Sequence, residues 1–254
     1  QSQDDQLNKT YDSFIAPVNS NSWIKTAALY QKAINAQGTE YNYLLSKVFD
    51  KGGYNRTHCI VRFQFEEFDA TLKLAKNQHE RNVMFAMKLF NNPGRTLEEI
   101  KRLYRLEPSY KEIPFLLLRE INKVEDWLLT NKVTEFESPA VYGQNYWEDY
   151  PEYSEKNYRN DMLYTRQLYD FLQQIISEGN QKSTALLHLY AAHLSLLDND
   201  YNRSRKHLML AKSEKKLPPN VQTQIRVNWF LLDLENGMNK QTEDQFMWIM
   251  KSPD

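Results

Sequence analysis

The fold of this chain is decided by residues 184 to 220, which read TALLHLYAAHLSLLDNDYNRSRKHLMLAKSEKKLPPN. This stretch predicts two amphipathic helices that are joined by a turn at residues 198–201. Small residues and one leucine occupy the positions where two such helices would touch; they are Ala191, Ala192, Ser204, Leu208 and Ala211. Helix pairs of this size are the units of α-solenoids, which present concave surfaces to other molecules.

The composition of the whole chain favours helices throughout. Only 7 of its 254 residues are Gly, which weighs against β and α/β folds and against a phosphate-binding loop. Apolar spacing and capping residues predict about ten or eleven helices and no strand, including one helix over 57–76 and another over about 109–130. We therefore expect an all-α fold, a right-handed α-solenoid of antiparallel helix pairs.

The predicted domain organisation has two parts. Residues 1–19 form a polar segment, extended or partly ordered, and residues 20–254 form a single helical repeat domain with an aromatic loop at about 137–153. The chain begins with Gln1, and after a last amphipathic helix predicted over 241–250 it stops at Asp254, inside the repeat pattern. The hypothesis is a processed N-terminus, with a signal segment or lipid anchor lost from it, and a longer native chain.

Charge and cysteine content restrict the partners and the compartment. The net charge is −1, from 32 basic and 33 acidic side chains, which argues against nucleic acid as a partner. The single Cys59 cannot form an internal disulfide, as in cytosolic or bacterial periplasmic proteins. No apolar run approaches the roughly 20 residues that a bilayer requires, so we expect no transmembrane segment in this chain.

The helix pair resembles the tetratricopeptide repeat over about 35 residues. After the turn come an aromatic residue, a small one, a bulky apolar one and an alanine, namely Tyr201, Ser204, Leu208 and Ala211. The pair departs from the repeat because His188 replaces the usual aromatic residue of the first helix and the proline is displaced. The resemblance implies a tetratricopeptide-like solenoid.

A second resemblance covers about half of the chain, from Pro114 to Trp248. The stretch LLREINKVEDWLLT at 117–130, an aromatic and acidic loop, and then the helix pair are similar to a family of uncharacterised exported Bacteroidetes proteins. This resemblance implies an exported protein of the periplasm or the outer membrane. It supplies no activity and no catalytic residue.

Two neighbouring residues on the predicted helix 109–130 are binding candidates. Glu120 flanks the apolar stripe of that helix, which consists of Ile113, Leu117, Ile121, Val124 and Leu128, and Arg119 lies on an adjacent face. A carboxylate beside an apolar stripe is costly unless it is paired. The favoured interpretation is a structural ion pair between helices, and the functional one is a polar anchor in a ligand groove.

The other binding candidates are the aromatic residues of the loop, Tyr142, Tyr146, Trp147, Tyr150 and Tyr153. Long loops inside compact folds are often functional. Exposed Tyr and Trp rings suit sugar rings or peptide side chains, because they combine a broad apolar face with a polar edge. The alternative is that these rings fill the groove of the solenoid or cover a helix end.

No catalytic, metal or cofactor motif is recognisable. His188 and His193 are five residues apart, so they do not share a helix face as a metal-binding pair at spacing four would. We therefore predict a non-enzymatic binding scaffold of the bacterial cell envelope, without cofactor, which holds a protein or peptide on a concave helical surface. The alternative is a glycan-binding envelope protein that uses the 142–153 loop, and the third hypothesis is a carboxylate-dependent hydrolase.

Overall fold

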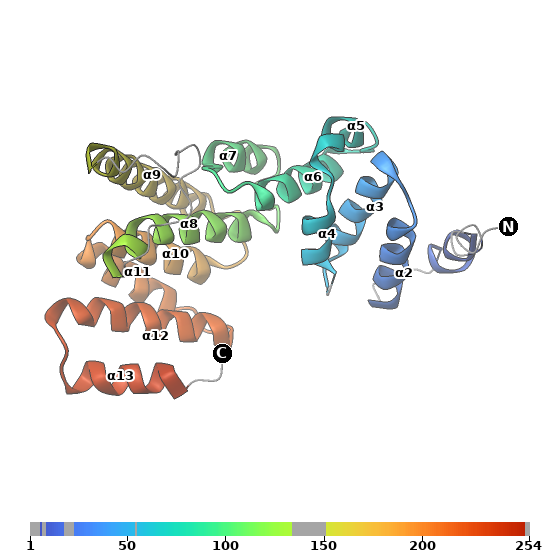
Figure 1. Cartoon of the computed structure of the whole chain (residues 1–254). Helices are drawn as coiled ribbons and strands as arrows, with labels where there is room; N and C mark the ends of the chain where they lie inside the picture. Colours follow the sequence, from blue (N-terminus) through green and yellow to red (C-terminus); the bar gives the residue numbers. More distant parts are fainter. Residues whose placement is uncertain (1–5, 7–8, 18–22, 54, 134–150, 252–254) are drawn as a thin grey trace. The chain divides into compact units, whose positions relative to one another are not determined.

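The computed structural model describes residues 6, 9–17, 23–53, 55–133 and 151–251 (Figure 1). Within these residues the protein is all-α, with about 12 helices and no strand, which confirms the all-α part of the predicted fold class; the solenoid arrangement stays a prediction. The chain divides into two compact units, residues 1–92 and 93–254. The single helical domain over 20–254 stays a prediction.

The first unit is built around helix α3. Its elements are a π-helical turn (Tyr11–Ile15), α2 (Trp23–Ile34), α3 (Gly38–Lys51), α4 (Arg56–Arg62), a 3₁₀ turn (Phe65–Glu67), α5 (Phe68–Leu72) and α6 (Gln78–Asn91). Helix α3 contacts α2, α4, α5 and α6. It buries Leu45, Val48 and Phe49 almost completely, so the core of this unit follows one face of α3.

The prediction of one helix over 57–76 is wrong, because the helical structure is interrupted between α4 and α5. The side chain of Asn42, on α3, is fully buried and bonds both backbone groups of Gln64. Gln64 N donates to Asn42 Oδ1 at 2.9 Å, and Asn42 Nδ2 donates to Gln64 O at 2.7 Å. These bonds hold Gln64 in an extended conformation (φ −86°, ψ 101°) that no helix can include.

In the described residues of the second unit, seven α-helices pack on one another in chain order. They are α7 (Leu97–Leu106), α8 (Ile113–Val133), α9 (Pro151–Glu178), α10 (Thr184–Leu197), α11 (Tyr201–Lys212), α12 (Pro219–Asp233) and α13 (Lys240–Lys251). Every consecutive pair is in contact, and α10 also contacts α8 and α12. Apart from the connection between α8 and α9, residues 134–150, neighbouring helices are joined by six residues or fewer, which favours contact between consecutive helices as in other helix hairpins.

Helices α10 and α11 approach each other closely, as predicted. Ala191, Ala192, Ser204, Leu208 and Ala211 are all fully buried. The Ser204 hydroxyl donates to the backbone carbonyl of Ala192 at 2.8 Å, a bond between the two helices that a larger side chain would prevent. The buried cluster at the contact between α10 and α11 continues into α12. It consists of Leu189, Ala192, Leu208, Ala211, Val221, Ile225 and Leu232.

The buried stripe predicted for α8 is also confirmed. Its five residues, Ile113, Leu117, Ile121, Val124 and Leu128, are at most 2% exposed. The helix begins at Ile113 instead of residue 109, because turn hydrogen bonds from Tyr110 N to Glu107 O and from Ile113 N to Tyr110 O precede it. In the part of the chain that the structure describes, no helix is both long enough and apolar enough to cross a bilayer.

Candidate functional site

The predicted aromatic loop lies almost entirely outside the described residues. Tyr142, Tyr146, Trp147 and Tyr150 belong to residues 134–150, so their role in binding stays a prediction. The predicted limits of the loop need one correction, because α9 already begins at Pro151. Tyr153 is therefore helical, and its side chain is outside the described set.

Glu120, one of the predicted binding residues, is fully buried and accepts hydrogen bonds from the N-terminal end of α7. Its carboxylate accepts a hydrogen bond from Thr96 N at 3.0 Å and another from Thr96 Oγ1 at 2.7 Å. Thr96 directly precedes α7, and its hydroxyl bonds Glu120 on α8 instead of the backbone of its own helix. A carboxylate is stabilised at this place by the partial positive charge of the helix N-terminus.

Two further side chains complete the surroundings of Glu120. The hydroxyl of Tyr164, on α9, donates to Glu120 and accepts from the backbone N–H groups of Thr96 and Leu97, each at 3.1 Å. The ammonium group of Lys123 bonds Glu120 and the carbonyl of Gly94. Burial raises the pKa of Tyr164 and the Glu120 charge raises it further, so its hydroxyl stays protonated.

Lys123 is itself nearly inaccessible to solvent. Burial lowers the pKa of Lys123, and the neighbouring Glu120 carboxylate opposes this shift. Each contact of Glu120 described above joins it to a group of the same unit, so this residue connects α7, α8 and α9. Its function as a ligand anchor stays a prediction. Arg119 lies beside it on α8, partly exposed, and its Nε atom is buried without a hydrogen-bond partner in the described part of the chain.

His188 and His193 lie in different hydrogen-bond networks, and His188 is paired with a third histidine, His207. His188 Nδ1 lies 3.1 Å from Nδ1 of His207 on α11, and the hydroxyl of Tyr169 lies 2.9 Å from Nε2 of His207. One imidazole must donate its Nδ1 proton to the other, which requires at least one neutral ring. Burial and the nearby charges of His188, Lys206 and Arg203 lower the pKa of His207 to about 4.

The other histidine, His193, is buried, and its partners are an amide oxygen and a carboxylate. Its Nδ1 lies 3.0 Å from Oδ1 of Asn228, and its Nε2 lies 3.3 Å from a carboxylate oxygen of Glu125. Burial acts to lower the pKa of His193, but Glu125 and Asn228 outweigh this effect and the net shift is upward. The same contact lowers the pKa of Glu125. His193 therefore connects α10 to α8 and α12.

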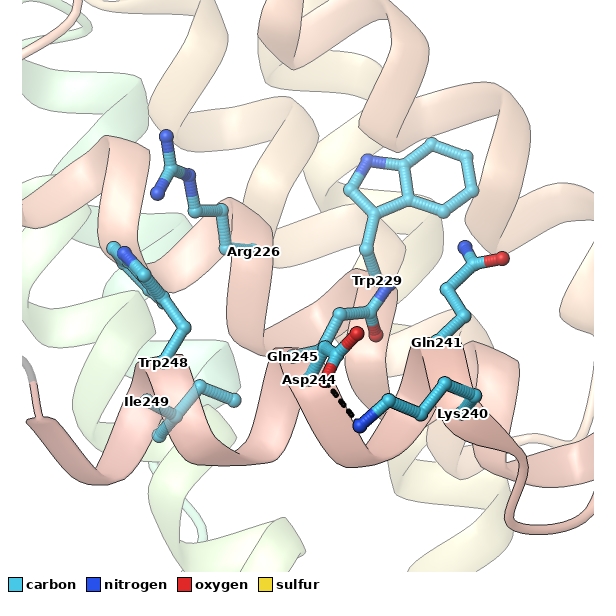
Figure 2. A pocket seen from close by; sticks show the side chains of 8 residues that line it. All are labelled: Arg226, Trp229, Lys240, Gln241, Asp244, Gln245, Trp248 and Ile249. Atoms are coloured by element: carbon cyan, nitrogen blue, oxygen red, sulfur yellow. Dashed lines mark ion pairs between the residues drawn. The ribbon is translucent and has the colours of Figure 1, made fainter.

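A pocket of about 780 Å³ lies between α12 and α13, near the C-terminal end of the chain (Figure 2). Its lining residues are Arg226, Trp229, Lys240, Gln241, Asp244, Gln245, Trp248 and Ile249. Arg226 and Trp229 are three residues apart on α12, so they point to the same flank of that helix. In Figure 2, Trp248 and Arg226 stand at one end of the pocket and Trp229 at the other.

Polar groups border the two indole rings. The guanidinium group of Arg226 lies over the Trp248 ring, 4.3 Å from its centroid. Lys240 and Asp244 form an exposed ion pair at 3.0 Å. Gln245 Nε2 donates to Asp233 on α12, whereas Gln245 Oε1 is buried and accepts no hydrogen bond within the described residues. The pocket thus combines aromatic faces with a few polar groups, as small-ligand and peptide sites do.

Helix α13 exposes most of its apolar side chains. Only Thr242 of this helix is fully buried. The exposed fractions are 43% for Phe246, 49% for Met247, 37% for Trp248 and 67% for Met250. Exposed apolar residues that gather in this way next to a pocket are characteristic of interaction surfaces.

The pocket was not predicted from the sequence, although the sequence contains a signal for it. The stretch Phe246–Met250 reads FMWIM, which is more apolar than one buried face of a surface helix requires. Such an excess indicates a helix that exposes apolar surface. Trp229 gives no such signal, because it is partly buried and packs against the core beside Val221, Ile225 and Leu232 of the same helix.

Comparison with known proteins identifies no relative: no protein-family model, no curated protein and no solved structure matches this chain. The resemblances to the tetratricopeptide repeat and to exported Bacteroidetes proteins therefore stay predictions. Among the residues that the structure describes, no group of three or more His, Cys, Asp and Glu side chains is arranged to hold a metal ion.

The network of Glu120 predicts a large loss of stability on truncation. Glu120→Ala removes the partner of a buried ammonium group and of a helix N-terminus, and we expect it to lower the free energy of unfolding by about 3–5 kcal/mol. The matched control is Glu98→Ala on α7, whose exposed pair with Lys101 contributes little, so its effect stays within about 0.5 kcal/mol. Urea unfolding measures both, and equal stabilities of the two variants would contradict the structural role of Glu120.

The lowered pKa of His207 predicts a loss of stability in acid. The unfolded state binds a proton near the ordinary value of 6.5 and the folded state only near 4, so stability falls as the pH decreases between these values. His207→Gln removes this contribution, and we expect its stability to decrease less over that interval, by on the order of 2 kcal/mol. Denaturant titrations at several pH values test this, with Asn202→Gln, an exposed position on the same helix, as the control that keeps wild-type pH dependence. An unchanged pH dependence in His207→Gln would refute it.

Proposed function

We propose that this chain is a non-enzymatic helical binding protein that holds a protein or peptide partner around the α12–α13 pocket. The observation that carries the proposal is a pocket with two tryptophans beside the exposed apolar residues of α13. Tryptophan side chains dominate the energetics of protein interfaces when they are placed in such pockets. An amphipathic segment of a partner would cover Phe246, Met247 and Met250 while it inserts one side chain into the pocket.

The proposal includes a tetratricopeptide-like solenoid as the scaffold. The close α10–α11 pair, its continuation into α12 and the contacts between consecutive helices of the second unit support this. In such scaffolds each helix pair is held by its neighbours and offers one face to a partner. The location in the bacterial cell envelope is the part of the proposal that depends on the sequence resemblance alone.

A glycan is the alternative partner. The predicted loop 142–153 lies outside the described residues apart from the first turn of α9. The two indole rings of the pocket, with Gln241 and Asp244 at its border, are also of the kind that stacks on sugar rings and bonds their hydroxyl groups. Glycan binding that depends on the same tryptophans would therefore assign the pocket to a different ligand class.

Selection of peptides on the intact chain tests the proposal. We expect a random peptide library displayed on phage to yield binders whose affinity falls about 30-fold in Trp248→Ala, because a central tryptophan anchor is lost. Tryptophan fluorescence and anisotropy of a labelled peptide measure the affinities. Circular dichroism verifies that the variant remains helical.

Trp23→Ala is the matched control, because Trp23 is 79% exposed on α2 in the other unit. This variant should bind the selected peptides as the wild type does. Peptides that bind Trp248→Ala with wild-type affinity, or a selection that yields no binder, would overturn the proposal. A glycan-array signal that Trp248→Ala abolishes would replace the peptide by a glycan.

A further inference from the structure

We infer that the partner of the α12–α13 pocket is an acidic peptide, which places an apolar side chain against the two tryptophans and a carboxylate on Arg226. This inference rests on the proposed function and specifies the chemistry of the ligand at that same site. It depends on the charges that line the pocket, the orientation of one guanidinium group and the size of the space beside it.

Of the charged side chains that line the pocket, one cation forms no ion pair within the described residues and is available to a ligand. Of the three charged residues that line the pocket, Lys240 and Asp244 pair with each other at 3.0 Å, and both are well exposed. Arg226 is exposed and lies against the Trp248 ring. No ion pair joins Arg226 to a carboxylate within the described residues, and the sum of the lining charges is positive. A ligand with a negative charge is the complement of this arrangement.

The stacking on Trp248 prepares Arg226 for a carboxylate. A guanidinium group that lies over an aromatic ring is held by the cation–π interaction, and its N–H groups point outward in its own plane. This orientation matches a carboxylate, which accepts two parallel hydrogen bonds from the fork. Because the aromatic contact already restricts the side chain, less conformational entropy is lost when the acid binds.

The space next to Arg226 suits an apolar side chain of the same peptide. Trp229, Trp248 and Ile249 supply the apolar part of the lining, and about 780 Å³ is within the range of pockets that bury a ligand group of several heavy atoms. Arg226 and Trp229 lie one helical turn apart on α12, so a carboxylate and an apolar group bound to them would be close neighbours. A peptide with Asp or Glu near Leu, Phe or Trp meets this requirement.

The test is a double-mutant cycle, which combines variants of the protein with variants of peptides that were selected on the wild-type chain. We expect the selected sequences to be rich in Asp or Glu near a bulky apolar residue. We also expect Arg226→Gln to weaken such a peptide about 10-fold, since it loses a charged hydrogen-bonded pair. The same variant should bind the peptide with its Glu replaced by Gln as the wild-type protein does.

Two protein controls make the outcome specific. Arg226→Lys keeps the charge but loses the planar fork, so we expect part of the affinity to be lost, whereas Arg102→Gln, an exposed position on α7, should change nothing. Equal effects of Arg226→Gln on the Glu and Gln peptides, or selected peptides without acidic residues, would overturn the inference and leave peptide binding intact. If no peptide binds the wild-type chain, the proposed function fails, and the inference fails with it.

Discussion

The second unit depends on the close approach of α10 and α11, which only small side chains permit. The bond from the Ser204 hydroxyl to the Ala192 carbonyl requires the backbones to be near each other, and Leu208 and Ala211 fill the remaining space. This pair presents the surface on which Val221, Ile225 and Leu232 of α12 are buried. Since α13 packs on α12, the proposed binding surface is positioned through this sequence of contacts (Figure 1). Well-packed interiors transmit such constraints because they contain little free space.

Each unit also contains a carboxylate that joins the start of one helix to its neighbours. Glu120 accepts from a backbone N–H before α7, a tyrosine hydroxyl and a lysine. In the first unit Glu80 does the same with Lys76 N at 2.8 Å, Tyr43 at 3.0 Å and Lys47. A carboxylate with three such donors repays the cost of its burial, whereas an unpaired one would not. Both clusters explain why strongly polar residues occur inside helical cores.

The sequence predicted the features that depend on local periodicity and failed where a distant residue decides the structure. The stripe of α8 and the small residues of α10 and α11 were predicted correctly, because helical spacing identifies them. The break in the helix over 57–76 is caused by Asn42, which is distant in sequence and has no local signal at Gln64. Most partners of Glu120 and His207 were missed for the same reason, since Thr96, Tyr164, Tyr169 and His188 belong to other elements that are distant in sequence. Sequence alone places Glu120 next to an apolar stripe but does not identify Tyr164 or Thr96 as its partners.

The proposed binding surface is a consequence of an uneven distribution of apolar residues in the last hairpin. Helix α12 uses one face for the core and places Arg226 and Trp229 on a flank, while α13 has more apolar residues than its contact with α12 covers. The position of both helices depends on the close contact between α10 and α11. Hydrogen exchange of Ser204→Leu tests this dependence, with Asn202→Leu, an exposed position of the same helix, as reference. We expect α10, α11 and α12 all to lose protection in Ser204→Leu and to keep it in Asn202→Leu. Wild-type protection of α12 in Ser204→Leu would contradict it.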